Sequence, residues 1–278
     1  MQKNILLPTD FSDNALNAIH YALELFKNEK CRFYILNTIE MQVPVLSNLT
    51  GRLLETIKED SNKNLKELQE KLELTSINSK FHFQTIWSSK NLLSAITKSV
   101  IDYNIDLLVM GTKGATGAKE FLFGSNTNTI IKKMNFCPIL VIPENFDFVI
   151  PNQIAFPTDF KRFFSNIELK PIKDLASLYN SIIRVVHINV EDDLDDIQEN
   201  NLSALKQYLK KFEHTFHWVP DFTNKTKSIC TFIDELEVNM LVMVNYKHSF
   251  VENIIKEPII KKVGFHPIVP FMIIPDLN

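Results

Sequence analysis

The chain has 278 residues, which is enough for two domains, and 45% of them are hydrophobic, so sizeable cores can form. The formal net charge of -3 and the scattered Lys and Arg residues argue against a nucleic-acid partner and against a membrane-surface patch. No apolar run approaches the ~18 residues of a membrane helix. The three cysteines form no CxxC pair, and the start of the chain does not read as a signal peptide, so we expect a cytoplasmic protein.

Short apolar runs alternate with amphipathic segments along the first half of the chain. The predicted strands are 4–8, 31–39, 80–87, 106–111 and 138–142, and the predicted helices are 13–28, 51–74, 91–103 and 125–134. Ser12 is the expected N-cap of the first helix. Apolar strands separated by helices predict an α/β fold with a parallel sheet covered on both faces.

Three segments of the first half recur in the same order in the second half. "ILLPTDF" (5–11) returns as "IAFPTDF" (154–160), and "DLLVMG" (106–111) returns as "NMLVMV" (239–244). "IIKKMNFCPILVIP" (130–143) is similar to "IIKKVGFHPIVPFMIIP" (259–275). A duplicated domain explains this order, and we expect domains at 1–146 and 150–278.

Glycine is concentrated in one place. The chain has six glycines, and four of them lie in "GTKGATGAKEFLFGS" (111–125), which follows a predicted strand and leads into a predicted helix. Glycine at the strand end is expected to permit a positive φ and a close approach of a ligand to the backbone. Gly124 and Ser125 open the helix, where free N–H groups favour an anion, although Ser125 as a simple N-cap is the alternative.

Two familiar phosphate motifs are absent: the chain has no GxxxxGK[ST] and no GxGxxG. The spacing G-x2-G-x9-G-[ST] in "GTKGATGAKEFLFGS" instead resembles the ATP-binding members of the universal stress protein family. "ILLPTDFS", "ILNTIE" and "CPILVIP" extend this resemblance over nearly the whole first half. It implies two tandem five-stranded parallel-sheet domains of adenine-nucleotide α-hydrolase-like, or Rossmann-like, topology.

The resemblance also implies a site for ATP or another adenine nucleotide, with Mg²⁺ on the phosphates. Pro8, Thr9 and Asp10 would line the base and the ribose, with the Asp10 carboxylate near ribose hydroxyls or a metal-bound phosphate. Thr38 would meet the adenine. The residues implied at the ribose and phosphates are Gly111, Thr112, Lys113, Gly114, Gly124, Ser125, Asn126 and Thr127.

The second half keeps "PTDF" but loses the glycines. In the alignment, the following residues replace Gly111, Gly114, Gly124 and Ser125 in turn: Val244, Lys247, Asn253 and Ile254. The β-branched Val244 and Ile254 disfavour a phosphate cradle. We therefore expect a degenerate second domain without nucleotide, which forms an intramolecular pseudo-dimer with the first; a homodimer is also open.

Several readings stay open from the residues alone. Asp10 after Pro-Thr is also a common turn acid. The protein is a nucleotide-binding stress sensor or regulator, a slow ATPase or phosphotransferase, or an interaction module without nucleotide; no catalytic residues can be named. The acidic run 191–200 predicts a solvated helix start rather than a calcium site, and His214 and His217 fall on opposite faces of a strand.

Overall fold

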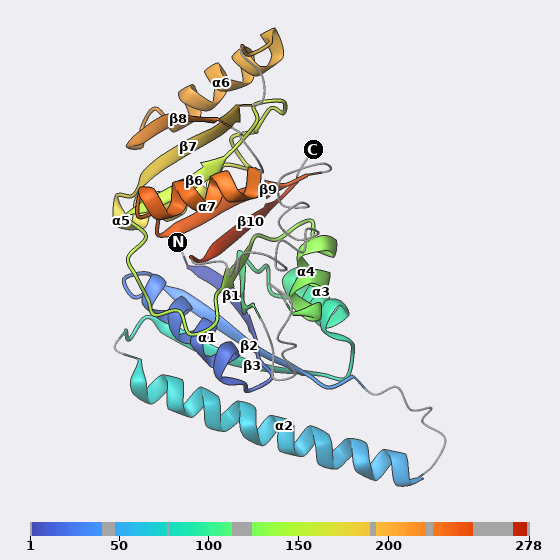
Figure 1. The fold of residues 1–278 in the computed structure, drawn as a ribbon. Coiled ribbons are helices and arrows are strands. Elements are labelled where there is room, and N and C mark those ends of the chain that lie inside the picture. Colours follow the sequence, from blue (N-terminus) through green and yellow to red (C-terminus); the bar gives the residue numbers. More distant parts are fainter. Residues whose placement is uncertain are drawn as a thin grey trace. The chain divides into compact units, whose positions relative to one another are not determined.

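In a computed structural model of the chain, the described residues are 2–40, 48–76, 78–112, 124–189, 193–220, 225–246 and 269–276. They divide into two compact units, which meet in the sequence at Phe148 and Val149. In each unit, parallel strands alternate with helices (Figure 1). The predicted α/β fold with parallel sheets is confirmed.

The sheet of the N-terminal unit has the strand order β3-β2-β1-β4-β5, and all its pairs are parallel. The chain moves outward from β1 to β3 and then returns to the other side of β1, so the strand order reverses between β1 and β4. The elements are β1 (Lys3–Pro8), α1 (Asp13–Leu25), β2 (Cys31–Thr38), α2 (Asn48–Thr75), β3 (Phe81–Ser88), α3 (Leu92–Asp102), β4 (Leu107–Gly111), α4 (Ser125–Lys133) and β5 (Ile139–Ile142).

The helices cover the sheet because each presents an apolar stripe to it. In α1 the apolar residues at helical spacing, Ala15, Ile19 and Ala22, are buried, whereas Leu23 is half-buried. The Ser12 hydroxyl accepts a hydrogen bond from the Ala15 N–H, which confirms Ser12 as the N-cap. α1 packs against β4 and β5, and α2 packs against β3 and β2. α3 packs against β1, β2 and α4 (Figure 1).

The C-terminal unit repeats the arrangement, with the order β10-β9-β6-β7-β8. Its elements are β6 (Gln153–Pro157), α5 (Lys170–Tyr179), β7 (Ile182–Asn189), α6 (Asp196–Leu209), β8 (His214–Pro220), α7 (Lys225–Glu235), β9 (Met240–Asn245) and β10 (Phe271–Pro275). The strand order reverses between β6 and β9. α6 begins as predicted in the acidic run, where Asp195 and Gln198 form a capping box.

The connection after the first strand differs between the units. In the N-terminal unit, residues 9–12 join β1 to α1, whereas residues 158–169 join β6 to α5. The longer connection carries Arg162 and Glu168, which form an ion pair. Within the described parts of the chain, no helix combines the length and the apolar character that a membrane span requires.

Candidate functional site

The predicted site residues lie at the carboxyl edge of the N-terminal sheet, where parallel α/β sheets bind ligands. Pro8 ends β1, Thr38 ends β2 and Gly111 ends β4. Thr9 and Asp10 follow β1, Thr112 follows β4, and the run from Gly124 to Thr127 begins α4. Lys113 and Gly114 fall outside the described residues, so their predicted roles stay predictions.

Two hydrogen bonds join the end of β4 to the start of α4. The Gly124 N–H donates to the Thr112 carbonyl at 2.5 Å. The Thr127 hydroxyl donates to the Gly111 carbonyl at 3.0 Å, and the Thr127 side chain is buried. Both arms of the glycine motif are therefore held together next to the point where the strand order reverses.

The N-terminus of α4 has no side-chain cap. Gly124 is the N-cap, with φ -57° and ψ 158°, and no side chain hydrogen-bonds there. The alternative of Ser125 as N-cap is therefore wrong, since Ser125 is the first helical residue. Ser125 and Asn126 are exposed, and the first-turn N–H groups of an α-helix lack acceptors within the helix. This helix end offers hydrogen-bond donors and a positive dipole end to an anion.

Gly111 is required for packing, which corrects the expected backbone role. No glycine among the described residues has a positive φ, so the predicted left-handed turn at Gly111 is wrong. A Cβ at Gly111 would lie 2.8 Å from Asn14 Nδ2 and 3.0 Å from the Asn14 carbonyl oxygen. α1 therefore approaches the end of β4 so closely that a side chain at position 111 would have to displace Asn14.

The loop after β1 is held by its own hydrogen bonds. The Thr9 hydroxyl accepts from the Phe11 N–H at 2.9 Å, and Asp10 Oδ1 accepts from the Ser12 hydroxyl at 2.6 Å. The Asn37 side chain donates to the Thr9 carbonyl at 2.7 Å. Asp10 therefore stabilises the turn after β1, which was the alternative to a role in ligand binding. Its carboxylate is nevertheless exposed and lies within the predicted site.

The same loop recurs in the C-terminal unit. The Thr158 hydroxyl accepts from the Phe160 N–H at 3.1 Å, and Asp159 accepts from the Lys161 N–H at 3.0 Å. Phe11 and Phe160 share a positive φ, of 63° and 56°. "PTDF" is thus a loop-forming motif in both units, and it does not by itself distinguish a nucleotide site.

The register of the strands places Val244 where the N-terminal unit has Gly111. β1 pairs Ile5 with Leu107, and β6 pairs Ile154 with Met240, so that β4 and β9 align residue by residue. Gly111 pairs with Ile142, and Val244 pairs with Ile274. The pairing of the strands therefore confirms that Val244 occupies the position of Gly111. Lys247, Asn253 and Ile254 lie outside the described residues.

Reasoning from the sequence missed three contributors to this edge. Asn14 packs against Gly111, Asn37 fixes the Thr9 carbonyl, and the Ser61 hydroxyl of α2 donates to Asn37 Oδ1 at 2.7 Å. Each contact joins elements that are distant in the sequence, so no local pattern of residues could predict it.

The described residues hold no group of three or more side chains suited to a metal ion. His214 Nδ1 donates to the Phe212 carbonyl at 2.9 Å, and His217 Nε2 lies 2.8 Å from the Thr215 hydroxyl oxygen. Burial raises the pKa of the Cys31 and Cys137 thiols to about 12. These thiols are therefore protonated and unsuited to nucleophilic chemistry near neutral pH.

Comparisons with known proteins identify the family of the N-terminal unit. The family model described as "Universal stress protein family" matches residues 1–143. Universal stress protein MJ0577 of Methanocaldococcus jannaschii is 31% identical over 156 residues, which cover 51% of this chain and 95% of that protein. Universal stress protein MJ0531 of the same organism is 28% identical over 145 residues, covering 51% and 82%.

The fold likeness extends over both units. The crystal structure of a universal stress protein from Archaeoglobus fulgidus DSM 4304 aligns with 98% of this chain and 96% of its own, with a TM-score of 0.69. The two sequences are 17% identical in this alignment, so the likeness establishes the fold alone. The C-terminal unit therefore has the expected Rossmann-like topology although the family match ends at residue 143.

Proposed function

Because this chain belongs to the universal stress protein family, we propose that its N-terminal unit binds one adenine nucleotide, with ATP as the first candidate. The observation that carries the proposal is the junction between β4 and α4. The Gly124 N–H bonds to the Thr112 carbonyl, and the Thr127 hydroxyl bonds to the Gly111 carbonyl. An uncapped helix start held at the reversal of a parallel sheet is a favourable place for a phosphate.

The residues around this junction suit the parts of a nucleotide. The exposed Ser125 and Asn126 supply donors for phosphate oxygens, together with Lys113 and Gly114 in our proposal. The exposed Asp10 carboxylate, beyond β1 on the other side of the reversal, suits ribose hydroxyls or Mg²⁺.

We assign the chain a role as a cytoplasmic sensor or regulator of the stress response. In this proposal the C-terminal unit is a degenerate copy, which pairs with the N-terminal unit as a pseudo-dimer. Fast phosphoryl transfer requires a positioned base and charge stabilisation at the phosphate. Asp10, the carboxylate next to the proposed site, already accepts two hydrogen bonds from Ser12, so we propose binding rather than turnover.

Isothermal titration of the full chain with ATP, ADP, AMP and adenosine, with and without Mg²⁺, tests the proposal. We expect one equivalent per chain, and tighter binding for the nucleotides than for adenosine. Gly114→Asp places a carboxylate among the phosphate contacts and is expected to abolish nucleotide binding. Lys247→Asp, at the aligned position of the C-terminal unit, is the matched control and is expected to bind as the unchanged chain does.

Three outcomes would contradict parts of this proposal. Absence of heat and of a thermal shift with all four ligands would refute nucleotide binding. Two equivalents per chain would refute the degenerate C-terminal unit. Hydrolysis of labelled ATP that is lost in Asp10→Asn would favour the slow ATPase instead.

A further inference from the structure

The C-terminal unit has a different arrangement at the place that corresponds to the proposed nucleotide site. Since Val244 takes the place of Gly111, Tyr246 stands two residues further on, at the position of Lys113. Asp159 follows β6 as Asp10 follows β1. The Tyr246 hydroxyl donates to Asp159 Oδ1 at 3.3 Å. This bond connects the ends of β9 and β6, the two strands between which the strand order reverses.

Tyr246 is a partly buried donor at this place. Burial raises the pKa of the Tyr246 phenol, and the Asp159 carboxylate raises it further. The phenol therefore keeps its proton at neutral pH and remains a hydrogen-bond donor to Asp159.

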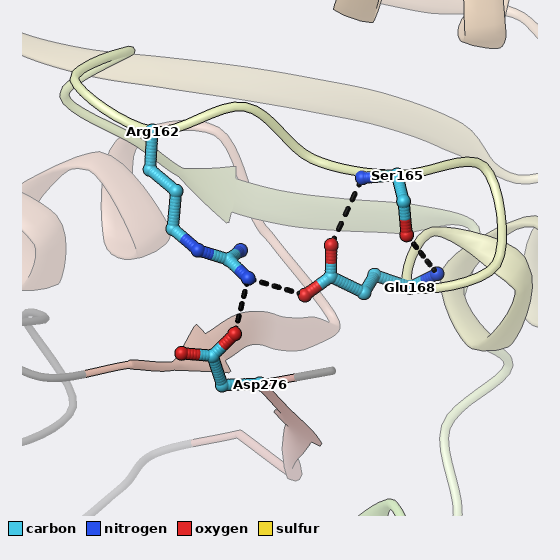
Figure 2. Close-up of polar contacts among 4 residues, drawn as sticks. All are labelled: Arg162, Ser165, Glu168 and Asp276. Carbon is cyan, nitrogen blue, oxygen red and sulfur yellow. Dashed lines mark hydrogen bonds and ion pairs between the residues drawn. The ribbon is translucent and has the colours of Figure 1, made fainter. Parts of the chain in front are cut away.

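Arg162 lies over Tyr246 and joins three segments of the unit. Its guanidinium is 5.2 Å from the centre of the Tyr246 ring and 5.4 Å from that of Phe164, which suits cation–π attraction. Nη2 donates to Glu168 and to Asp276, the residue directly after β10 (Figure 2). One nitrogen therefore ties the connection after β6 to the end of β10.

Glu168 is fully buried and depends on this arrangement. Its Oε1 accepts from Arg162, and its Oε2 accepts from the Ser165 N–H at 2.9 Å (Figure 2). The Ser165 hydroxyl accepts from the Glu168 N–H at 3.2 Å. A buried carboxylate without its cation is strongly destabilising, so Arg162 is required for this fold of the connection.

The side chains beside this network are also packed against one another. Phe160 stacks on His187 at 4.8 Å between ring centres, and both are buried, whereas Phe11 in the N-terminal unit is partly exposed. The Gln198 side chain donates to the Asp159 carbonyl at 2.8 Å. Among the described side chains of this network, the three carboxylates of Asp159, Glu168 and Asp276 outnumber the one guanidinium, which disfavours an anionic ligand beside them.

We propose that Arg162 is a latch that closes the ligand-binding edge of the C-terminal unit from within, by holding Tyr246 and the end of β10 against the connection that follows β6. The protein's own guanidinium and phenol occupy the place of a ligand. This closure does not depend on whether the N-terminal unit binds a nucleotide.

The test compares Arg162→Met with Lys211→Met, which removes an exposed cation of the same unit. Hydrogen exchange of the full chain, resolved by peptide, reports opening of β10 and of the connection 158–169. We expect exchange in both segments to rise by roughly 100-fold in Arg162→Met and to stay unchanged in Lys211→Met. Nitration of Tyr246 by tetranitromethane, mapped by mass spectrometry, is expected in Arg162→Met and not in the unchanged chain or in Lys211→Met.

Asp276→Asn keeps the test informative if Arg162→Met does not fold, because it replaces the charge-assisted bond from Arg162 to Asp276 by a weaker bond to a neutral amide, while Glu168 remains the counter-ion of Arg162. We expect exchange at β10 to rise by roughly tenfold in this variant, while exchange at β7 stays the same. Unchanged exchange at β10 in Asp276→Asn, or unchanged nitration of Tyr246 in a folded Arg162→Met, would overturn the proposal.

Discussion

Replacing Gly111 by alanine distinguishes the two explanations for a glycine at the end of β4. From the sequence, this glycine is explained by a ligand that approaches the backbone. In the structure, Asn14 of α1 lies 2.8 Å (Nδ2), 2.9 Å (Cγ) and 3.0 Å (carbonyl oxygen) from the position of an added Cβ. The packing explanation predicts a loss of stability in Gly111→Ala even when no nucleotide is present.

The size of the loss follows from these distances. Non-bonded carbon contacts prefer about 3.5–4.0 Å, so the new methyl group must move Asn14 or the strand end by about 0.5 Å or more. Overpacking of this kind costs about 1–3 kcal/mol. Alanine also restricts the unfolded chain, which offsets about 0.4–1 kcal/mol, because φ at Gly111 is not positive. We expect a net loss of about 1–2 kcal/mol, or roughly 2–4 °C in Tm for each kcal/mol.

Urea unfolding of the chain without nucleotide, combined with a double-mutant cycle, measures this effect. Asn14→Ala removes two of the three close atoms and leaves only the backbone oxygen at 3.0 Å. Gly111→Ala should therefore cost less in the Asn14→Ala background than in the unchanged chain, with a coupling of about 0.5–1.5 kcal/mol. Titration with ATP of the unchanged chain, the two single variants and the double variant reports how much of the affinity depends on this contact.

The packing explanation is refuted if Gly111→Ala unfolds at the same urea concentration as the unchanged chain. It is also refuted if the cost of the methyl group is the same with and without the Asn14 side chain. A loss of ATP affinity without any loss of stability would instead support the ligand explanation.

Three further predictions concern Thr127, the two buried cysteines and His217. Thr127→Val removes the hydroxyl that bonds to the Gly111 carbonyl and is expected to lower the free energy of unfolding by about 1–2 kcal/mol. It is also expected to weaken the binding of ATP more than that of adenosine, whereas Thr127→Ser retains the stability and the affinity for ATP. An equal loss of affinity for ATP and for adenosine in Thr127→Val would contradict a role at the phosphates. Cys31 and Cys137 are expected to resist iodoacetamide at pH 8 in the folded chain and to react after unfolding in urea, because burial raises the pKa of both thiols to about 12; rapid labelling of the folded chain would contradict this. Burial, with Arg184 nearby, lowers the pKa of His217, so the unfolded chain binds this proton more readily than the folded chain. The stability that neutral His217 contributes is therefore present above about pH 6.5 and is lost as the pH falls below it. His217→Gln is expected to lose less stability between pH 7.5 and pH 5 than the unchanged chain, and an identical loss would contradict the lowered pKa.

The sequence was sufficient for the order and type of the elements in the N-terminal unit and, through the repeat, for the same frame in the C-terminal unit. The periodic apolar stripe of α1, the cap at Ser12 and the short apolar strands are local patterns, so they can be read without knowledge of distant contacts. The sequence offered a turn role for Asp10 as an alternative, and the loop after "PT" forms in both units with the same Thr hydrogen bond.

The sequence by itself determined the family, the parallel α/β fold and the edge of the sheet at which the glycine motif lies, because spacing and repetition carry that information. The tertiary structure decided what individual residues do at that edge. Asn14 leaves little room for a side chain at Gly111, Thr127 holds the strand end, and Arg162 reaches Asp276 across 114 residues of sequence. These contacts join residues that only the register of the sheet and the packing of helices bring together, and no local pattern encodes either of them.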